Sequence, residues 1–496
     1  GADIISLPQE TGIESPAYDS IYFQDPKRFQ QAGNCENRIS PQPFNNKTVS
    51  CLFRQSLALS AWKQAGDTRW PLRVNPSSGN LHPTESYLLC GPTEGLTESA
   101  MVSHYGAGIH GLEKRAEIPL ATWQALQQCF QQPLLLLGIT SIHWREAWKY
   151  GERAYRYCHH DAGHAIAAIS LASASLGWQC RLLDDLSANQ LGILMGTGNH
   201  ENTVADKPDN EHPDCLLAIT ANPVTGSFAE SLPDSFWDEF KTLDWQGVPN
   251  NLSTQYVQWP IIEEVSAACE KPVTAFTQQV PVTSSSTPKY RPAPAAHPIF
   301  QQRRSAVDMD GQTSMSVSEF YGLLTRVLPD QVDAPFNALA WTPRVNLLLF
   351  VHRVDGLNPG LYILLRSPAL YNNNNDNNEN SLKALKNCFS SEFEWAKPDD
   401  CPAHMNLYRL VAGDARQASQ QLSCSQAIAA EGCFSLGMLA DFENTIRNAG
   451  PWLYPRLYWE CGAIGQVLYL EAESIGIRAT GIGCFFDDPV HQLAGI

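Results

Sequence analysis

Short apolar runs predict buried strands in both halves of the chain. Pro133-Leu-Leu-Leu-Leu-Gly-Ile139 is a continuous apolar run, and Val345-Asn-Leu-Leu-Leu-Phe-Val351 is another. Runs of this length that are bounded by turn residues are typical of strands buried in a sheet, and they are too short to span a membrane. We therefore expect sheet strands here and no membrane segment.

Two longer segments predict apolar helices with the same spacing of small residues. The first runs from Gly163 to Gly177 and the second from Gly462 to Gly476. In each, a Leu stands eight positions and a Gly fourteen positions after the first Gly. Small residues let two helix backbones approach closely, and a final Gly suits the end of a helix. Both segments are expected to be central packed helices.

Two further segments predict matching helix starts. Val49-Ser-Cys-Leu-Phe53 and Val317-Ser-Glu-Phe-Tyr321 each carry a Ser that we interpret as the N-cap. Because similar segments recur once, at a long interval, the pattern indicates two homologous domains and not a solenoid.

A segment rich in Pro, Ser and Thr separates the two halves. It lies between about Lys271 and His297, and its composition favours an extended linker because it cannot build a core. A chain of 496 residues also exceeds what one hydrophobic core normally spans. We predict a first domain over residues 1–268, a linker over 269–298 and a second domain over 299–496, with a surface loop at Asn372–Asn380.

Composition narrows the function classes. The net charge of −17 argues against binding a nucleic-acid backbone, which needs clustered Lys and Arg. The 14 cysteines include no Cys-x-x-Cys pair, so we interpret them as buried small side chains and not as disulfides or zinc ligands. The sequence is thus expected to belong to a cytoplasmic protein without nucleic-acid or membrane partners, and no metal site is predicted.

Three segments carry groups that suit a phosphate and a flat ring. The segment from Arg73 to Glu85 contains Pro-Ser-Ser-Gly-Asn, Arg303-Arg304-Ser305 pairs two arginines, and Thr480-Gly-Ile-Gly483 is glycine-rich. Arginine forks donate paired hydrogen bonds to phosphate oxygens, and glycine lets a backbone approach a ring closely. Each segment alone is ordinary, being typical of a turn, a solvated face and a loop.

Together these segments resemble the nitroreductase superfamily, and within it the SagB/ThcOx-type branch that oxidises azolines in peptides. The resemblance implies an α+β fold, a mixed sheet flanked by helices, that forms homodimers with flavin mononucleotide (FMN) between the subunits. Two fused copies in one chain would then form a pseudo-dimer, with the two domains in place of two subunits.

The two copies carry complementary parts of that flavin site. In the first copy Cys35-Glu36-Asn37 stands opposite the arginines, and Arg181-Leu-Leu-Asp184 stands opposite the glycine turn. The second copy has no counterpart of the Pro-Ser-Ser-Gly-Asn loop. We therefore predict one complete FMN site, formed by Arg303, Arg304, Ser305, Gly481, Ile482 and Gly483 together with Pro76, Ser77, Ser78 and Asn80. The alternative is that both sites have decayed.

A Lys-Tyr pair suggests where acid-base chemistry takes place. Lys149-Tyr150, within Trp148–Arg156, resembles the Lys-Tyr-Gly-x-Arg segment that supplies the catalytic pair in azoline oxidases. The matching stretch from Asn448 to Tyr454 has lost the pair. A Lys or Tyr near a flavin can move the proton that accompanies hydride transfer. The alternative is a pair on a helix surface with ordinary contacts, and His110 is interpreted as structural.

The resemblance implies an FMN-dependent oxidoreductase acting on a small-molecule or peptide substrate. The favoured reaction is dehydrogenation of a peptide azoline or a related substrate, with electrons passed to oxygen or another acceptor. One alternative is a reduced-nicotinamide-dependent reductase of quinones or nitro compounds. Another is a flavin-free scaffold that binds a partner.

Overall fold

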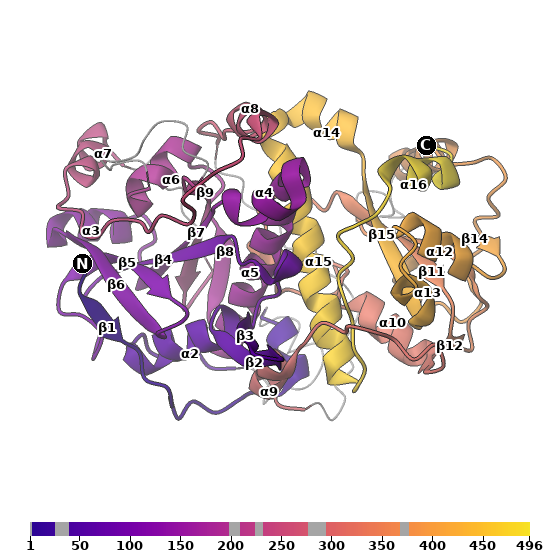
Figure 1. Ribbon diagram of the computed structural model, residues 1–496, viewed down its shortest axis with the longest axis horizontal. Helices are drawn as coiled ribbons and strands as arrows, with labels where there is room; N and C mark the ends of the chain where they lie inside the picture. The colour runs from indigo at the N-terminus through magenta and orange to yellow at the C-terminus, as the bar shows by residue number, and fades with distance from the viewer. Residues whose placement is uncertain (1, 25–38, 198–208, 224–231, 276–293, 368–375) are drawn as a thin grey trace.

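The structure of the protein is a computed structural model that describes residues 2–24, 39–197, 209–223, 232–275, 294–367 and 376–496 (Figure 1). Of residues 376–381 only the backbone is described. The predicted contrast between Cys35-Glu36-Asn37 and the arginines therefore lies outside the described residues, as do linker residues 276–293 and the first part of the Asn-rich run. No helix among the described residues has the length and apolar character needed to cross a bilayer.

The first half builds a seven-stranded antiparallel sheet in the order β1-β6-β5-β4-β7-β9-β8. Every residue of β7 is buried, which confirms the predicted strand at this position. The strands are β1 (Ile4–Ser6), β4 (Thr84–Cys90), β5 (Ala100–Gly106), β6 (Gly111–Ile118), β7 (Leu134–Ser141), β8 (Gln179–Leu182) and β9 (His212–Thr220).

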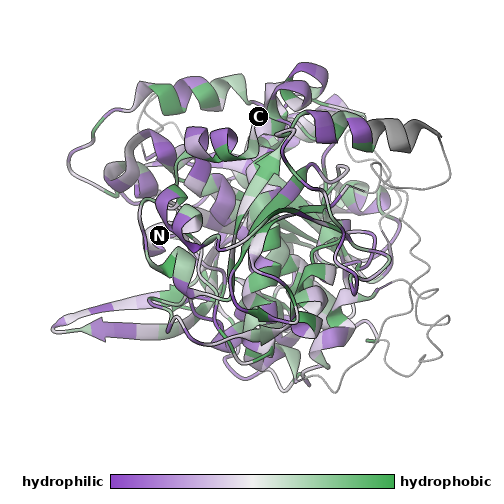
Figure 2. Cartoon of the chain, turned by 90° about the vertical axis from the view of Figure 1, so that its right-hand side faces the viewer, coloured by the Kyte–Doolittle hydropathy of each residue, from purple (hydrophilic) through white to green (hydrophobic). Residues whose placement is uncertain are grey.

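The second half builds a four-stranded antiparallel sheet in the order β14-β13-β11-β15. Its strands are β11 (Val345–Val351), β13 (Gly360–Leu365), β14 (Asn406–Ala412) and β15 (Phe434–Ala440), and β11 confirms the second predicted strand. A short parallel pair joins β10 (Met315–Ser316) to β12 (Val354–Asp355). The hairpin of β2 (Leu59–Ala65) and β3 (Thr68–Arg73) projects from the body of the molecule (Figure 2).

Two long helices lie side by side between the sheets (Figure 1), and they are the predicted apolar pair. They are α5 (Ala154–Ser175) and α15 (Tyr454–Ser474). A side chain on Gly163 would collide with the backbone of Trp459, and one on Gly462 would collide with the backbone of His160. The glycines thus allow the two backbones to cross in direct contact. Both helices end before a glycine of positive φ, as predicted: Gly177 at 72° and Gly476 at 79°.

The predicted helix starts are present, but their predicted caps are wrong. Asn45 caps α2 (Asn46–Ser56) and Ser316 caps α10 (Val317–Thr325), each in a capping box with the third helical residue. Ser50 and Ser318 lie inside these helices. Asn45 and Ser316 cap the helices because they precede the first turn, where their side chains can reach its free N–H groups.

Matching helices surround the central pair in both halves. In the first half α4 (Trp144–Tyr150) precedes α5 and α6 (Ala188–Met195) follows it, while in the second half α14 (Phe442–Ala449) precedes α15 and α16 (Asp487–Ala494) follows it. The remaining helices are α3 (Leu120–Gln128), α7 (Asp234–Lys241), α8 (Pro260–Ala268), α9 (Ala296–Gln302), α11 (Asp376–Asn387), α12 (Arg416–Leu422) and α13 (Ile428–Glu431). Helix α9 begins within the last residues of the predicted linker.

Candidate functional site

The Pro-Ser-Ser-Gly-Asn loop leaves β3 and is held by a buried carboxylate. The backbone N–H of Ser78 donates to Asp161 of α5 at 3.0 Å, and its hydroxyl donates to the same oxygen at 3.0 Å. Gly79 has a φ of 56°, which a side chain would strain. Burial raises the pKa of Asp161 to about 7, although hydrogen bonds from Ser77 and Ser78 oppose that rise. The loop is therefore fixed to the centre of the molecule.

The structure brings the predicted Lys-Tyr pair to this loop. A side chain on Gly79 would lie 3.1 Å from the Lys149 ammonium nitrogen and would collide with the Tyr150 hydroxyl. The ammonium group also lies 5.0 Å from the centre of the Tyr150 ring. Both side chains therefore border the loop from the end of α4. Lys149 is exposed and Tyr150 is half-buried.

Arg303 joins the second half of the chain to the same loop. Its Nε donates to the carbonyl oxygen of Val74 at 3.1 Å and its Nη2 to that of Arg73 at 3.2 Å. Its guanidinium lies 5.1 Å from the ring centre of Tyr469. The residue is 3% exposed, and its Nη1 is buried without a hydrogen-bond partner in the described structure. Burial lowers the pKa of Arg303 to about 10, so it stays charged at neutral pH.

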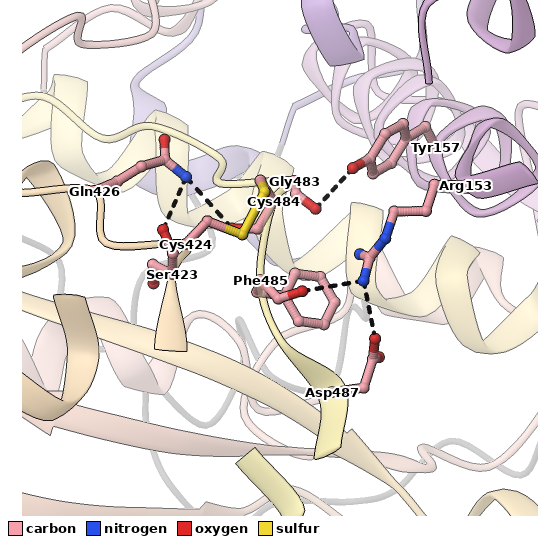
Figure 3. Close-up of a disulfide and its surroundings, with 9 residues drawn as sticks. All are labelled: Arg153, Tyr157, Ser423, Cys424, Gln426, Gly483, Cys484, Phe485 and Asp487. Atoms are coloured by element: carbon pink, nitrogen blue, oxygen red, sulfur yellow. Dashed lines mark hydrogen bonds and ion pairs between the residues drawn. A yellow bond between two sulfur atoms is a disulfide. The ribbon is translucent and has the colours of Figure 1, made fainter. Parts of the chain in front are cut away.

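The glycine turn is held by two tyrosines, one from each central helix. Gly481 N–H donates to the Tyr469 hydroxyl at 2.7 Å, which in turn lies 2.9 Å from the hydroxyl of Ser305. The Tyr157 hydroxyl donates to the carbonyl oxygen of Gly483 at 2.8 Å (Figure 3).

Tyr157 also links the glycine turn to the Lys-Tyr pair. Its ring lies edge-on to that of Tyr150, with centres 4.9 Å apart. The contacts therefore form a closed ring through the loop, Tyr150, Tyr157, the glycine turn, Tyr469 and Arg303. Segments from opposite ends of the sequence meet here, as predicted.

A disulfide stands directly after the glycine turn (Figure 3). Cys484 pairs with Cys424, which precedes α13. The prediction that the cysteines are buried small side chains is wrong for this pair, because residues 60 apart in sequence are brought together by the fold. Six free cysteines are buried as predicted: Cys51, Cys90, Cys158, Cys180, Cys215 and Cys461.

Some predicted site residues are occupied by other contacts. The Arg304 guanidinium donates to the carbonyl oxygens of Gln301, Arg303 and Ser60. The Asn80 amide donates to the Pro71 carbonyl oxygen at 3.0 Å.

Three other predicted loop and turn residues are Ser77, which also hydrogen-bonds Asp161, Pro76 and Ile482. Ser77 accepts a hydrogen bond from the N–H group of His82 at 2.8 Å. Pro76, next to it in the loop, and Ile482, in the glycine turn, are both half-buried. His110 bonds Ser50 and Tyr105 at 2.8 Å each, consistent with a structural role.

Sequence reasoning missed four groups at this site: Tyr157, Asp161, Glu146 and Tyr469. Glu146 of α4 is fully buried, and neither carboxyl oxygen has a hydrogen-bond partner in the described structure. Burial, together with the neighbouring Asp161, raises its pKa well above the usual range. A signal was available for α5, because Tyr157, Asp161 and His164 are polar residues four and three positions apart and so lie on one face of the helix.

An ion pair also joins the two halves of the chain at the central helices. Arg456 of α15 binds Asp184 through Nη2 at 2.8 Å and Nε at 3.0 Å. Its guanidinium also lies 4.7 Å from the ring centre of Trp452. Nearby on α15, buried Glu460 pairs with Arg366 at 2.6 Å.

Comparison with solved structures identifies the architecture. A presumed nitroreductase from Anabaena variabilis matches with a TM-score of 0.62 and 19% identity, over 98% of this chain and 90% of that chain. The chain has a nitroreductase-like fold. This confirms the nitroreductase-like fold expected from the sequence, while the pseudo-dimer of two fused domains and the azoline-oxidase branch stay predictions.

Two further structures match more weakly. A microcin synthetase complex from E. coli has a TM-score of 0.29 and 18% identity, over 37% of this chain and 65% of that chain. A presumed nitroreductase from Ralstonia eutropha has a TM-score of 0.31 and 16% identity, over 45% of this chain and 90% of that chain. Neither carries weight at such scores. No family model and no curated protein sequence matches the chain.

Proposed function

We propose that the chain is an FMN-dependent oxidoreductase whose two halves form a pseudo-dimer with one flavin at their interface. The observation that carries the proposal is Arg303. It comes from the second half, it is bound to carbonyl groups at the base of the first half's loop, and it retains one buried N–H group without a partner. A buried guanidinium donor of this kind is costly unless an anion completes it.

The surrounding residues fit the rest of a flavin mononucleotide. Arg303 would hold the phosphate, with Ser305 beside it. The glycine turn would offer the backbone N–H groups of Ile482 and Gly483 to the ring edge, since that of Gly481 already donates to Tyr469. Ser77 and Ser78 would supply polar groups from the opposite half. Arg304 and Asn80 are assigned to holding the loop and the arginine segment in place, because their donors already bind carbonyl groups.

When bound, FMN would supply a two-electron acceptor for a C–H bond. The chain itself would supply proton transfer: Lys149 and Tyr150 stand at the loop, and buried Glu146 lies behind them on the same helix. Because Lys149 is exposed, a large substrate such as a peptide azoline can reach it. We infer azoline dehydrogenation as the favoured reaction on this basis.

Kinetics of two variants test this assignment. Lys149→Ala and Tyr150→Phe should retain the flavin spectrum and fold yet slow substrate dehydrogenation by about a hundredfold, as expected when general-base help is lost. Reduction of bound flavin by dithionite should be unchanged. Lys47→Ala, an exposed lysine of α2, is the matched control.

Wild-type turnover in both variants would assign the pair a structural role. Turnover of quinones or nitro compounds with reduced nicotinamide, without azoline oxidation, would replace the proposed substrate. Absence of any bound flavin would favour the scaffold.

A further inference from the structure

Two histidines and a glutamate converge on the far side of α4 from the loop. His143 directly precedes α4, His212 begins β9, and Glu263 lies on α8. One nitrogen from each histidine and one carboxylate oxygen all lie within 4.8 Å of one another. Three elements distant in sequence therefore bring three potential metal ligands together.

His143 is the unusual member of this group. It is 2% exposed, and neither ring nitrogen has a hydrogen-bond partner in the described structure. Its ring stacks on that of His212, with centres 4.3 Å apart and planes inclined by 21°. An unpartnered buried nitrogen destabilises the folded protein, and stacking does not satisfy it because the nitrogen lone pair lies in the ring plane.

We propose that His143, His212 and Glu263 bind one divalent metal ion of the Zn²⁺ class. Two imidazoles and one carboxylate are a ligand set that Zn²⁺ uses when it keeps its fourth position for water. Glu263 is exposed, so the third ligand comes from the surface of α8.

Binding requires a rearrangement of the side chains. Ligand atoms about 2.0–2.1 Å from a tetrahedral ion lie roughly 3.3 Å apart, against the limit of 4.8 Å here. Glu263 can approach by changing rotamer, and the stacked imidazole rings must turn so that their in-plane lone pairs converge on one ion. The metal would then tie α8 and β9 to the start of α4, whose other end carries the Lys-Tyr pair.

Metal titration tests the site independently of flavin. The full-length protein, stripped with a chelator, should bind about one Zn²⁺ per chain in competition with a chromophoric chelator. Glu263→Gln and His212→Ala should each weaken binding by more than the roughly 10–100-fold typical of losing a supporting group around a metal. His491→Ala, which removes an exposed histidine of α16, should bind as wild type does.

Co²⁺ gives a second readout that separates this site from adventitious binding to cysteines. The Co²⁺ protein should show visible ligand-field bands without the ultraviolet charge transfer of thiolate ligands. Glu263→Gln is the decisive variant, because an exposed helix residue can be changed without risk to the core. Failure of the wild type to bind Zn²⁺, thiolate charge transfer, or unchanged affinity in Glu263→Gln and His212→Ala would overturn the proposal.

Discussion

The Tyr157 hydroxyl of α5 donates to the carbonyl oxygen of Gly483, whereas Arg456 of α15 binds the carboxylate of Asp184. The two contacts correspond, because Tyr157 and Arg456 are separated by the same number of residues as Gly163 and Gly462, and so are Asp184 and Gly483. We call the first the glycine site and the second the charged site: the first is a hydrogen bond to the glycine turn, and the second is an ion pair.

A second correspondence follows the same division. Asp161 accepts two hydrogen bonds from Ser78 of the loop. The corresponding residue of α15 is Glu460. It accepts hydrogen bonds from the N–H groups of Arg344 and Val345 and forms an ion pair with a buried arginine. Similar backbones thus serve two purposes. The glycine site keeps polar groups available beside a loop, and at the charged site the ion pair holds the two halves together.

The largest expected effect comes from removing the ion pair at the charged site. Arg456→Ala should lower the free energy of unfolding by about 3–5 kcal/mol, because it leaves the largely buried Asp184 carboxylate without its partner. Denaturant unfolding measures this. Tyr157→Phe, at the corresponding position, should cost only about 0.5–1.5 kcal/mol for one hydrogen bond. Equal losses of unfolding free energy in the two variants would contradict the distinction between the charged site and the glycine site.

The pH dependence of stability separates Asp161 from its counterpart. Its folded pKa of about 7 lies above its ordinary value, so its contribution to stability is present below about pH 4 and is lost as pH rises through 7. Asp161→Asn should therefore gain stability relative to wild type as the pH rises from 4 to 8, because the variant has no carboxyl group to ionise. A difference that is constant with pH would show that Asp161 ionises normally.

The disulfide stabilises only the glycine site. The residue of the first half that corresponds to Cys484 is Asp185, which cannot form a disulfide. Cys424→Ser should lower stability by about 2–4 kcal/mol, because the unfolded chain loses a cross-link. Thermal unfolding with and without dithiothreitol measures the effect, and the variant itself should not respond to the reductant. A wild-type melting temperature that reductant does not change would mean that the bond contributes nothing.

The two adjacent arginines should differ in flavin affinity. Arg303→Ala should weaken FMN binding by about tenfold to a hundredfold, the value of a charge-assisted bond of roughly 1.5–3 kcal/mol. Arg304→Ala should weaken it less, since its guanidinium already binds carbonyl groups. Riboflavin, which lacks the phosphate, should bind both variants as it binds wild type. The reverse order would place the phosphate on Arg304.

Residue type and spacing were sufficient for some of this architecture. Apolar runs identify β7 and β11, and recurring glycines identify the central helices, because a buried surface imposes these patterns locally. Arginines and glycines likewise mark groups that suit a phosphate and a ring.

The remaining features depend on contacts that a sequence does not encode locally. The Arg456–Asp184 pair and the Cys424–Cys484 bond join residues far apart in the chain. Asp161 could equally have been a capping or surface residue. Which polar group meets which is decided by how the two halves pack.

The stoichiometry of flavin binding tests the central claim most directly. FMN should be titrated into apo-protein and followed by quenching of flavin fluorescence. One glycine site and one charged site that is filled by an ion pair predict about one FMN per chain, with FMN binding weakened by Arg303→Ala. Two equivalent sites would show that the charged site also accepts flavin, and no binding would show that neither site does.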